Sequence, residues 1–210
     1  MKYKLDIIIP VYNEDKIILD LLSNLDRNIS FSFRILICYD YENDTTLNKI
    51  LNSNLNLKNI LFVKNKSSGP NNAILTGIEK SQADILLVYM VDDLINLSLI
   101  NNMIGLIDSG YDLIIPSRFV DGGKFIGANL FKKIITILGF ISIHNIAGIP
   151  YKDCTNAFKM FKTNILNEFK LNSNIGFTYA LELTIKSHYK KNKIVEIPSQ
   201  WLEIEGRHGK

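Results

Sequence analysis

Carboxylate side chains follow two of the apolar segments of this 210-residue chain. Asp40 comes soon after the segment 35–38, and Asp92 and Asp93 come directly after the segment 85–91. Two adjacent carboxylates repel one another unless a cation compensates. Carboxylate oxygens combined with the oxygens of a diphosphate are the usual ligands of Mg²⁺, and Mn²⁺ takes the same kind of ligand. The pattern therefore indicates a site for a charged ligand, with capping of the following helix as the alternative for Asp92 and Asp93.

Other polar residues lie at comparable positions. Asp40 is placed to accept hydrogen bonds from a base or a ribose, whereas Asp44 precedes Thr45 in a position typical of a helix cap. The small polar loop 64–70 contains Gly69 and precedes a helix, so its amides can meet a phosphate at the helix N-terminus. Arg118 lies in the glycine-rich segment 117–127, which is typical of a functional loop.

Several function classes are disfavoured. The chain has no GxGxxG after its first strand and no GxxxxGKS, which argues against dinucleotide dehydrogenases and P-loop NTPases. Its three histidines are scattered, without a hydrolase arrangement, and a net charge of +3 is too small to indicate nucleic acid. Cys38 and Cys154 show no metal-binding spacing, and residues 1–9 do not resemble a signal peptide. We expect a reducing, cytoplasmic location.

The first 116 residues alternate apolar segments and amphipathic stretches. Continuous apolar segments of this kind are typical of parallel strands covered on both faces. The expected strands are 7–9, 35–38, 60–63, 85–91 and 113–115, and the expected helices include 17–25, 71–80 and 96–107. Short connections between repeated strand–helix–strand units predict a doubly wound α/β sheet in a single domain.

The second half, residues 117–210, has a different pattern. An apolar-rich stretch at 129–149 predicts a helix, and its longest apolar part, 134–149, is shorter than a bilayer requires. It is suited to lie in a membrane interface, with burial against the sheet or against a second copy as the alternative. A loop and strand at 153–161, a helix at 176–189 and a strand at 193–197 follow. Residues 206–210 indicate either a loose end or the start of an active-site loop.

The order of these motifs resembles family 2 glycosyltransferases of the GT-A fold, a Rossmann-like, mostly parallel arrangement. The similarity covers nearly the whole chain and is greatest to the branch that includes dolichol-phosphate mannose synthase and polyprenyl-phosphate glycosyltransferases. The motifs that carry it are IIPVYNE at 8–14, Asp40-x3-Asp44-Thr45, Gly69, Val91-Asp92-Asp93, Ser117-Arg118-Phe119, Gly122-Gly123, Phe131-Lys132-Lys133, DCTNAFK at 153–159, Gly176-Phe177 with Leu181-Glu182, and VEIP at 195–198.

The resemblance implies a donor site in residues 1–116. Pro10, Tyr12 and Glu14 would line the nucleoside pocket, with Asp40 near the base or ribose. Asp93 matches the second acid of the family's Asp-x-Asp motif and would ligate Mg²⁺ or Mn²⁺ on the donor diphosphate. Asp92 and Gly69 would also contact the donor.

Residues 117–210 would then form the acceptor half of the same domain. Arg118, Lys132 and Thr136 would meet the phosphate of a lipid acceptor, a polyprenyl or dolichyl phosphate. The implied activity is metal-assisted, inverting transfer of a sugar from a nucleotide sugar, with peripheral contact at the cytoplasmic face of a membrane.

Two alternatives remain open at this point. If the acceptor is a sugar hydroxyl in glycan assembly, a general base is needed, and Asp153 is the best candidate. Because Tyr39 and Val91 replace acids of the family's motifs, a non-catalytic protein that binds nucleotide sugars is the other alternative.

Overall fold

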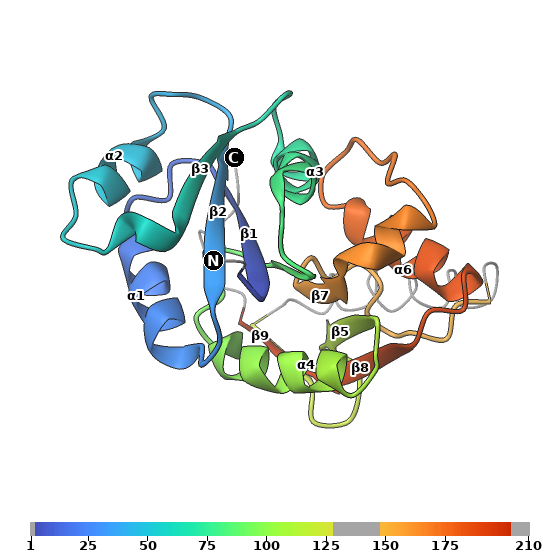
Figure 1. Cartoon of the computed structure of the whole chain (residues 1–210). Helices are drawn as coiled ribbons and strands as arrows, with labels where there is room; N and C mark the ends of the chain where they lie inside the picture. Colours follow the sequence, from blue (N-terminus) through green and yellow to red (C-terminus); the bar gives the residue numbers. More distant parts are fainter. Residues whose placement is uncertain (1–2, 128–147, 203–210) are drawn as a thin grey trace.

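A computed structural model of the protein describes residues 3–127 and 148–202. Its centre is a seven-stranded sheet in the order β3-β2-β1-β4-β7-β5-β8 (Figure 1). The strands are β1 (Leu5–Val11), β2 (Phe33–Tyr39), β3 (Ile60–Lys64), β4 (Ile85–Val88), β5 (Leu113–Ser117), β7 (Lys159–Lys162) and β8 (Ile194–Pro198). Strand β7 is antiparallel to both of its neighbours, β4 and β5, and all other neighbouring strands in this sheet are parallel. The predicted α/β architecture with a mostly parallel sheet is confirmed.

Helices cover both faces of this sheet. The α-helices are α1 (Ile18–Asn28), α2 (Thr45–Leu51), α3 (Pro70–Lys80), α4 (Leu99–Asp108) and α6 (Tyr179–Tyr189), and short 3-10 turns occupy Leu57–Asn59, Asn96–Ser98 and Thr163–Asn167. Helices α1, α2 and α4 pack into one apolar cluster, and α3 and α6 pack into another on the opposite face. Both faces of the central strands are therefore buried, which explains their continuous apolar sequences.

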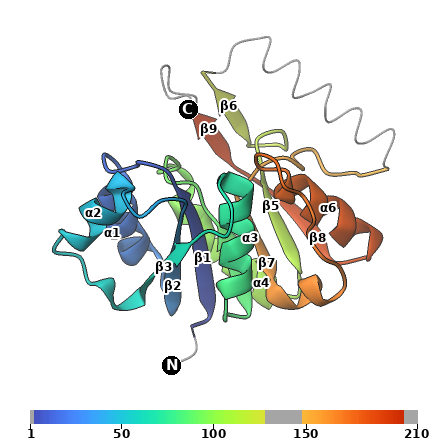
Figure 2. The same cartoon turned by 90° about the horizontal axis from the view of Figure 1, so that it is seen from above.

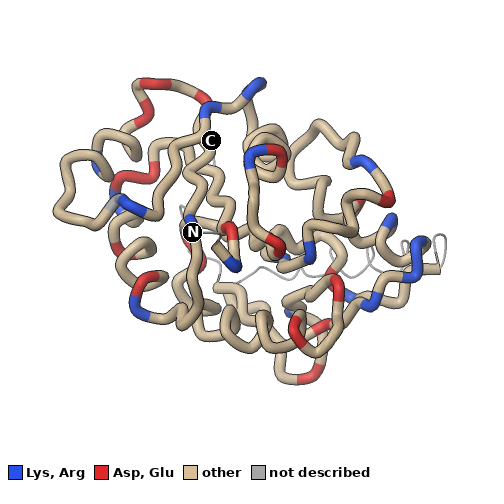
Figure 3. Tube along the Cα trace, in the orientation of Figure 1, with Lys and Arg blue, Asp and Glu red and all other residues tan. Residues whose placement is uncertain are grey.

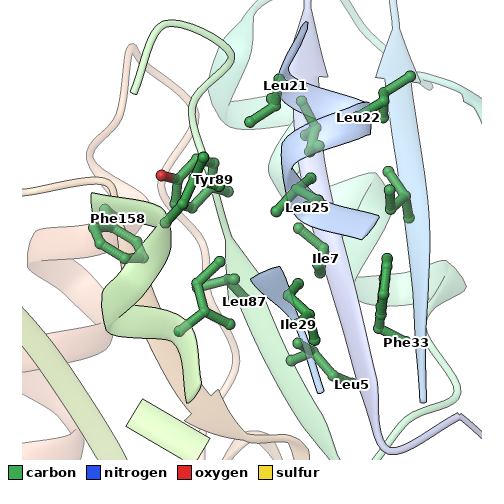
Figure 4. Packing of buried hydrophobic residues seen from close by; sticks show 14 of the residues in the cluster. Leu5, Ile7, Leu21, Leu22, Leu25, Ile29, Phe33, Leu87, Tyr89 and Phe158 are labelled. Atoms are coloured by element: carbon green, nitrogen blue, oxygen red, sulfur yellow. The ribbon is translucent and has the colours of Figure 1, made fainter. Parts of the chain in front are cut away.

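The alternation of side chains along β1 shows this double burial. Ile7 and Ile9 belong to the cluster with α1, whereas Ile8 belongs to the cluster with α3. Figure 4 shows Leu25 of α1 beside Ile7, with Leu87 of β4 on the neighbouring strand. Because these residues are fully buried, truncation of any one of them to alanine is expected to cost about 2–5 kcal/mol.

Helix α3 lies close to the sheet because it carries a glycine at the contact. A Cβ at Gly77 would lie 2.6 Å from Cγ2 of Ile8 and 2.9 Å from the sulfur of Cys38. The absence of a side chain therefore lets the helix approach β1 and β2, and the start of the helix, with Gly69 and Pro70, lines the site described below.

A second, two-stranded sheet pairs β6 (Lys124–Ile126) with β9 (Gln200–Leu202) in parallel. It stands beyond the end of the main sheet that is opposite the N-terminus (Figure 2). The sequence did not predict either strand. Strand β4 also ends at Val88, three residues earlier than expected.

Most of the expected helix 129–149, with Lys132 and Thr136, lies outside the described residues, as does the segment 206–210. Among the helices of the described ranges, none has both the length and the apolar character needed to cross a bilayer. In the described ranges, lysine and arginine residues are interspersed with aspartate and glutamate residues (Figure 3).

Candidate active site

A cavity of about 1080 Å³ opens at the carboxyl ends of β1, β2 and β4. The chain proceeds from β1 outward through β2 to β3 and then returns to place β4 on the other side of β1. Ligands of open α/β sheets bind at such a topological switch point. Of the residues expected to form the site, Pro10, Tyr12, Glu14, Asp40, Gly69, Asp92 and Arg118 line this cavity.

Asp40 holds the start of α3 against the end of β2. Its Oδ1 accepts a hydrogen bond from Nδ2 of Asn65 at 2.7 Å, and its Oδ2 accepts one from the amide of Gly69 at 2.9 Å. Gly69 has a φ of 103°, a backbone conformation that residues with a side chain rarely adopt. Pro70 follows as the first helical residue. Asp40 therefore fixes the helix N-terminus at the cavity wall while it faces the cavity itself.

The loop after β1 is held by the cap of α2. Asp44 is buried, and its carboxylate accepts hydrogen bonds from the amide of Thr46 at 2.8 Å and from the amide of Asn13 at 3.1 Å. Asn13 has a φ of 55° and accepts a hydrogen bond from the amide of Thr45. The cap expected for Asp44 is thus present, and it also fixes the loop that carries Tyr12, whose side chain is 52% exposed.

Asp92 and Asp93 point in different directions. Asp92 is exposed and lines the cavity, whereas Asp93 is only 6% exposed. The carboxylate of Asp93 accepts hydrogen bonds from the amides of Ile95 and Asn96 and from Nδ2 of Asn96 at 2.8 Å. Burial raises the pKa of Asp93, and the donors from Asn96 act in the opposite direction.

This geometry differs from the expectation that Asp93 binds the metal. Its oxygens are committed to protein donors, and the carboxylate that faces the cavity belongs to Asp92. In the described ranges, no three His, Cys, Asp or Glu side chains gather as a ready-made metal site. Mg²⁺ is commonly held by one or two carboxylates, substrate phosphates and water. Asp92 therefore fits a metal that arrives with a diphosphate.

Arg118 reaches the cavity wall from the end of β5. Its Nε and Nη2 donate to the two oxygens of Asp153 at 2.8 and 2.7 Å, and its own amide donates to the same carboxylate at 2.9 Å. Asp153 is 1% exposed, so its carboxylate is committed to Arg118 and is not open to a substrate. This geometry differs from the expectation that Asp153 is a general base and gives it a positioning role.

The turn that contains Asp153 is anchored from several sides. Glu196 of β8 accepts hydrogen bonds from the amides of Lys152 and Asp153. Nζ of the buried Lys159 donates to the backbone carbonyl of Asp153 at 3.3 Å. Nδ2 of Asn156 donates to the carbonyl of Pro116, next to the strand end that carries Arg118. These contacts fix the part of the cavity wall that is formed by Arg118 and the turn 153–157, which lies outside the donor motifs.

Sequence reasoning missed several residues that line the cavity, among them Asn156, Phe177 and Trp201. Phe177 follows Gly176 in a motif that the resemblance had matched without a role. Trp201 belongs to a three-residue strand, which is too short for periodicity to reveal. The only available signal was its uniqueness, since the chain contains one tryptophan.

Comparison with protein families identifies the family of this chain. The family model for glycosyl transferase family 2 matches residues 6–170. The chain belongs to glycosyl transferase family 2. The match covers the β1 loop, the acidic turn of Asp92 and Asp93, Arg118 and the Asp153 turn, so most of the cavity lining comes from the matched segment, and Phe177 and Trp201 lie beyond it.

Three curated proteins similar to this chain are named as dolichol-, dolichyl- or undecaprenyl-phosphate transferases. A dolichol-phosphate mannosyltransferase of Pyrococcus furiosus is 30% identical over 202 residues, which are 93% of this chain and 55% of that protein. A dolichyl-phosphate beta-glucosyltransferase of Trichomonas vaginalis is 24% identical over 95% of this chain and 66% of its own length. An undecaprenyl-phosphate mannosyltransferase of Micrococcus luteus is 26% identical over 45% of this chain and 40% of its own length. The chain spans about half the length of the curated relatives it matches.

Solved structures agree on the fold. Glucosyl-3-phosphoglycerate synthase of Mycobacterium tuberculosis, in complex with Mn²⁺, UDP and glucosyl-3-phosphoglycerate, has a TM-score of 0.69 at 13% identity over 94% of this chain and 70% of its own. TarS of S. aureus has a TM-score of 0.65 at 17% identity over 94% of this chain and 58% of its own. These neighbours confirm the expected GT-A fold for this family 2 chain.

Proposed function

We propose that this chain transfers a sugar from a nucleotide sugar to a lipid phosphate of the polyprenyl or dolichyl type. One observation carries the proposal. Tyr12, Asp40 and Asp92, which lie in loops and at strand ends that suit a nucleotide, line the same cavity as the cationic Arg118. One cavity can therefore accommodate a donor and an anionic acceptor together.

The nucleoside would lie against the β1 loop and the start of α3. Tyr12 offers an exposed ring, and Asp40 retains lone pairs for a ribose or base after binding Asn65 and Gly69. Pro10 and Glu14 complete this part of the wall. The fixed conformation of Asn13 reduces the entropy that the loop would lose on binding.

Asp92 is the side chain that would hold Mg²⁺ or Mn²⁺ on the donor diphosphate. A divalent metal there would neutralise the negative charge that develops on the diphosphate as it leaves the sugar. Asp93 supports this role indirectly, because its bonds to Asn96 hold the turn so that Asp92 faces the cavity. The Mn²⁺ and Mg²⁺ complexes of the mycobacterial synthase support a metal in this fold.

Arg118 would bind the acceptor phosphate. Asp153 accepts hydrogen bonds from Nε and from one hydrogen of Nη2 of Arg118. This two-point pairing fixes the orientation of the guanidinium, so the directions of its remaining hydrogens are fixed as well. Lys132 and Thr136 stay predictions for the same phosphate. An acceptor that is already anionic needs no strong general base. The commitment of Asp153 to Arg118 therefore favours a phosphate over a sugar hydroxyl.

The relatives' names support the same acceptor class, since they include dolichol-phosphate and undecaprenyl-phosphate transferases. Inversion at the sugar carbon remains a prediction from the family resemblance. Peripheral contact with a membrane, at its cytoplasmic face, remains a prediction from the apolar stretch 129–149.

A transfer assay tests the proposal. The chain is incubated with Mg²⁺ and radiolabelled GDP-mannose or UDP-glucose, with either undecaprenyl phosphate or undecaprenol as acceptor in detergent. We expect label in the lipid extract with undecaprenyl phosphate and none with the alcohol. A parallel reaction contains an oligosaccharide acceptor in place of the lipid, and transfer of label to this acceptor alone would favour the glycan-assembly alternative. Donor binding without any transfer would favour a non-catalytic role.

A further inference from the structure

Trp201 enters the cavity from the two-stranded sheet. In the parallel register of this sheet, Phe125 of β6 pairs with Trp201 of β9, so both aromatic side chains lie on the same face. The Arg118 guanidinium carbon lies 5.0 Å from the centroid of the Phe125 ring, and Phe119 packs edge-to-face on the same ring. The sheet therefore turns its aromatic face toward the cavity, next to Arg118.

Asn96 joins this sheet to the acidic turn. Its Nδ2 donates to the carbonyl of Gln200 at 2.7 Å, and its Oδ1 accepts a hydrogen bond from the amide of Gln200 at 3.0 Å. The same Nδ2 also donates to Asp93 at 2.8 Å. Asn96 is buried, with both ends of its amide in use. One side chain thus fixes β9, and with it Trp201, to the turn that presents Asp92.

These two contacts place Trp201 between the residues that the proposed function assigns to the diphosphate and to the acceptor. The backbone of β9 is fixed to the acidic turn through Asn96, and its aromatic partner packs on Arg118. The group that must lie between a diphosphate and an acceptor phosphate is the sugar being transferred. An indole ring presents a flat apolar face with a polar edge, which suits the C–H face of a pyranose ring.

From this placement we propose that Trp201 contacts the sugar ring of the bound donor and that Asn96 is the positioning residue that keeps the indole there. The inference rests on the proposed function and adds the residue that recognises the sugar. It predicts that the sugar, and not the nucleoside diphosphate, shields Trp201 from solvent.

The single tryptophan of the chain makes this measurable without an activity assay. Calorimetry first establishes which of GDP-mannose and UDP-glucose binds in the presence of Mg²⁺. Acrylamide quenching of the fluorescence excited at 295 nm is then compared for the free protein, the nucleoside diphosphate complex and the nucleotide-sugar complex, with all complexes at saturation. We expect the quenching constant to fall clearly only with the nucleotide sugar, by about twofold for an indole covered on one face.

Matched asparagine variants test the positioning role. Asn96→Ala should bind the nucleoside diphosphate but lose the sugar-specific protection of Trp201. Asn101→Ala is the control, because Asn101 of α4 also bonds two backbone groups, the carbonyl of Asn28 and the amide of Ser30. This control should retain the protection.

Trp201→Phe, which preserves an aromatic ring, should weaken nucleotide-sugar binding less than Trp201→Ala. We expect the affinity of Trp201→Ala for the nucleotide sugar to fall about three- to tenfold.

The outcomes distinguish failure of the role of Trp201 from failure of the proposed function. Equal protection by the diphosphate and the nucleotide sugar, with both bound, would overturn the role of Trp201 and leave the proposed function intact. Protection that survives in Asn96→Ala would overturn the positioning role of Asn96. Absence of binding by both donors would contradict the proposed function itself, and the inference with it.

Discussion

The guanidinium of Arg118 and the carboxylate of Asp153 form a two-point ion pair, with N–O distances of 2.8 and 2.7 Å, across 35 residues of sequence. The Asp153 side chain is completely buried and that of Arg118 is 15% exposed. A forked pair of this kind fixes both the position and the orientation of the cation. Arg118 is thereby held at the cavity wall before any acceptor binds.

Removal of Asp153 should damage both stability and acceptor binding. Asp153→Ala leaves a largely buried guanidinium without its partner, and we expect the free energy of unfolding to fall by about 3 kcal/mol. Urea unfolding measures this loss. Asp108→Ala is the control, since it breaks an exposed pair with Lys4 and should cost less than about 1 kcal/mol. Equal losses in the two variants would contradict the positioning role of Asp153.

The cap of α2 gives a prediction about donor binding. Asp44→Ala should lower the free energy of unfolding by about 1–2 kcal/mol, because the amide of Thr46 loses its acceptor. Asp44→Ser can keep this cap but provides no second oxygen for the amide of Asn13. We therefore expect Asp44→Ser to unfold almost like the wild type yet to bind the donor more weakly in calorimetry. Donor affinity unchanged in the serine variant would show that the loop does not need this contact.

Lys159 gives a prediction about pH. Burial lowers the pKa of its ammonium group from 10.5 to about 8, although the nearby Asp153 charge acts in the opposite direction. Between these two pH values the unfolded chain binds more protons at this position than the folded chain. The free energy of unfolding of the wild type should therefore rise with pH across this window, relative to that of Lys159→Met.

Urea unfolding of both proteins at several pH values from 7 to 10.5 checks this sign. Below pH 8 the difference between the two proteins should level off, because both states of the wild type are then protonated. A difference that stays constant from pH 7 to 10.5 would mean that the buried amine keeps its ordinary pKa.

The sequence predicted the parts of the fold whose signal is local. Strands β1 to β5 were found because apolar residues such as Ile7, Ile8 and Ile9 are buried on both faces, which leaves no polar interruption. The helices α1, α3 and α4 were visible from their apolar stripes. Asp40 and Arg118 line the cavity, and the sequence indicated this position because each directly follows a strand.

What the sequence did not predict depends on contacts between distant segments. The turn after β4 presents Asp92 and buries Asp93, and this choice is stabilised by Asn96, whose other partner, Gln200, lies 104 residues away. Strands β6 and β9 are three residues each, so neither shows a periodic pattern, and they pair across 76 residues of the chain, with Lys124 opposite Gln200. The role of Trp201 follows from that pairing.

The most direct test of the account is calorimetric titration of GDP-mannose and UDP-glucose, with and without Mg²⁺, into the wild type, Asp92→Asn and Asp26→Asn. Asp26 is an exposed carboxylate on α1, outside the cavity lining, and serves as the control. We predict that Mg²⁺ strengthens binding of one donor by about tenfold or more in the wild type and the control, and that Asp92→Asn loses this gain. A metal effect that persists in Asp92→Asn, or a wild type that binds neither donor, would contradict the account.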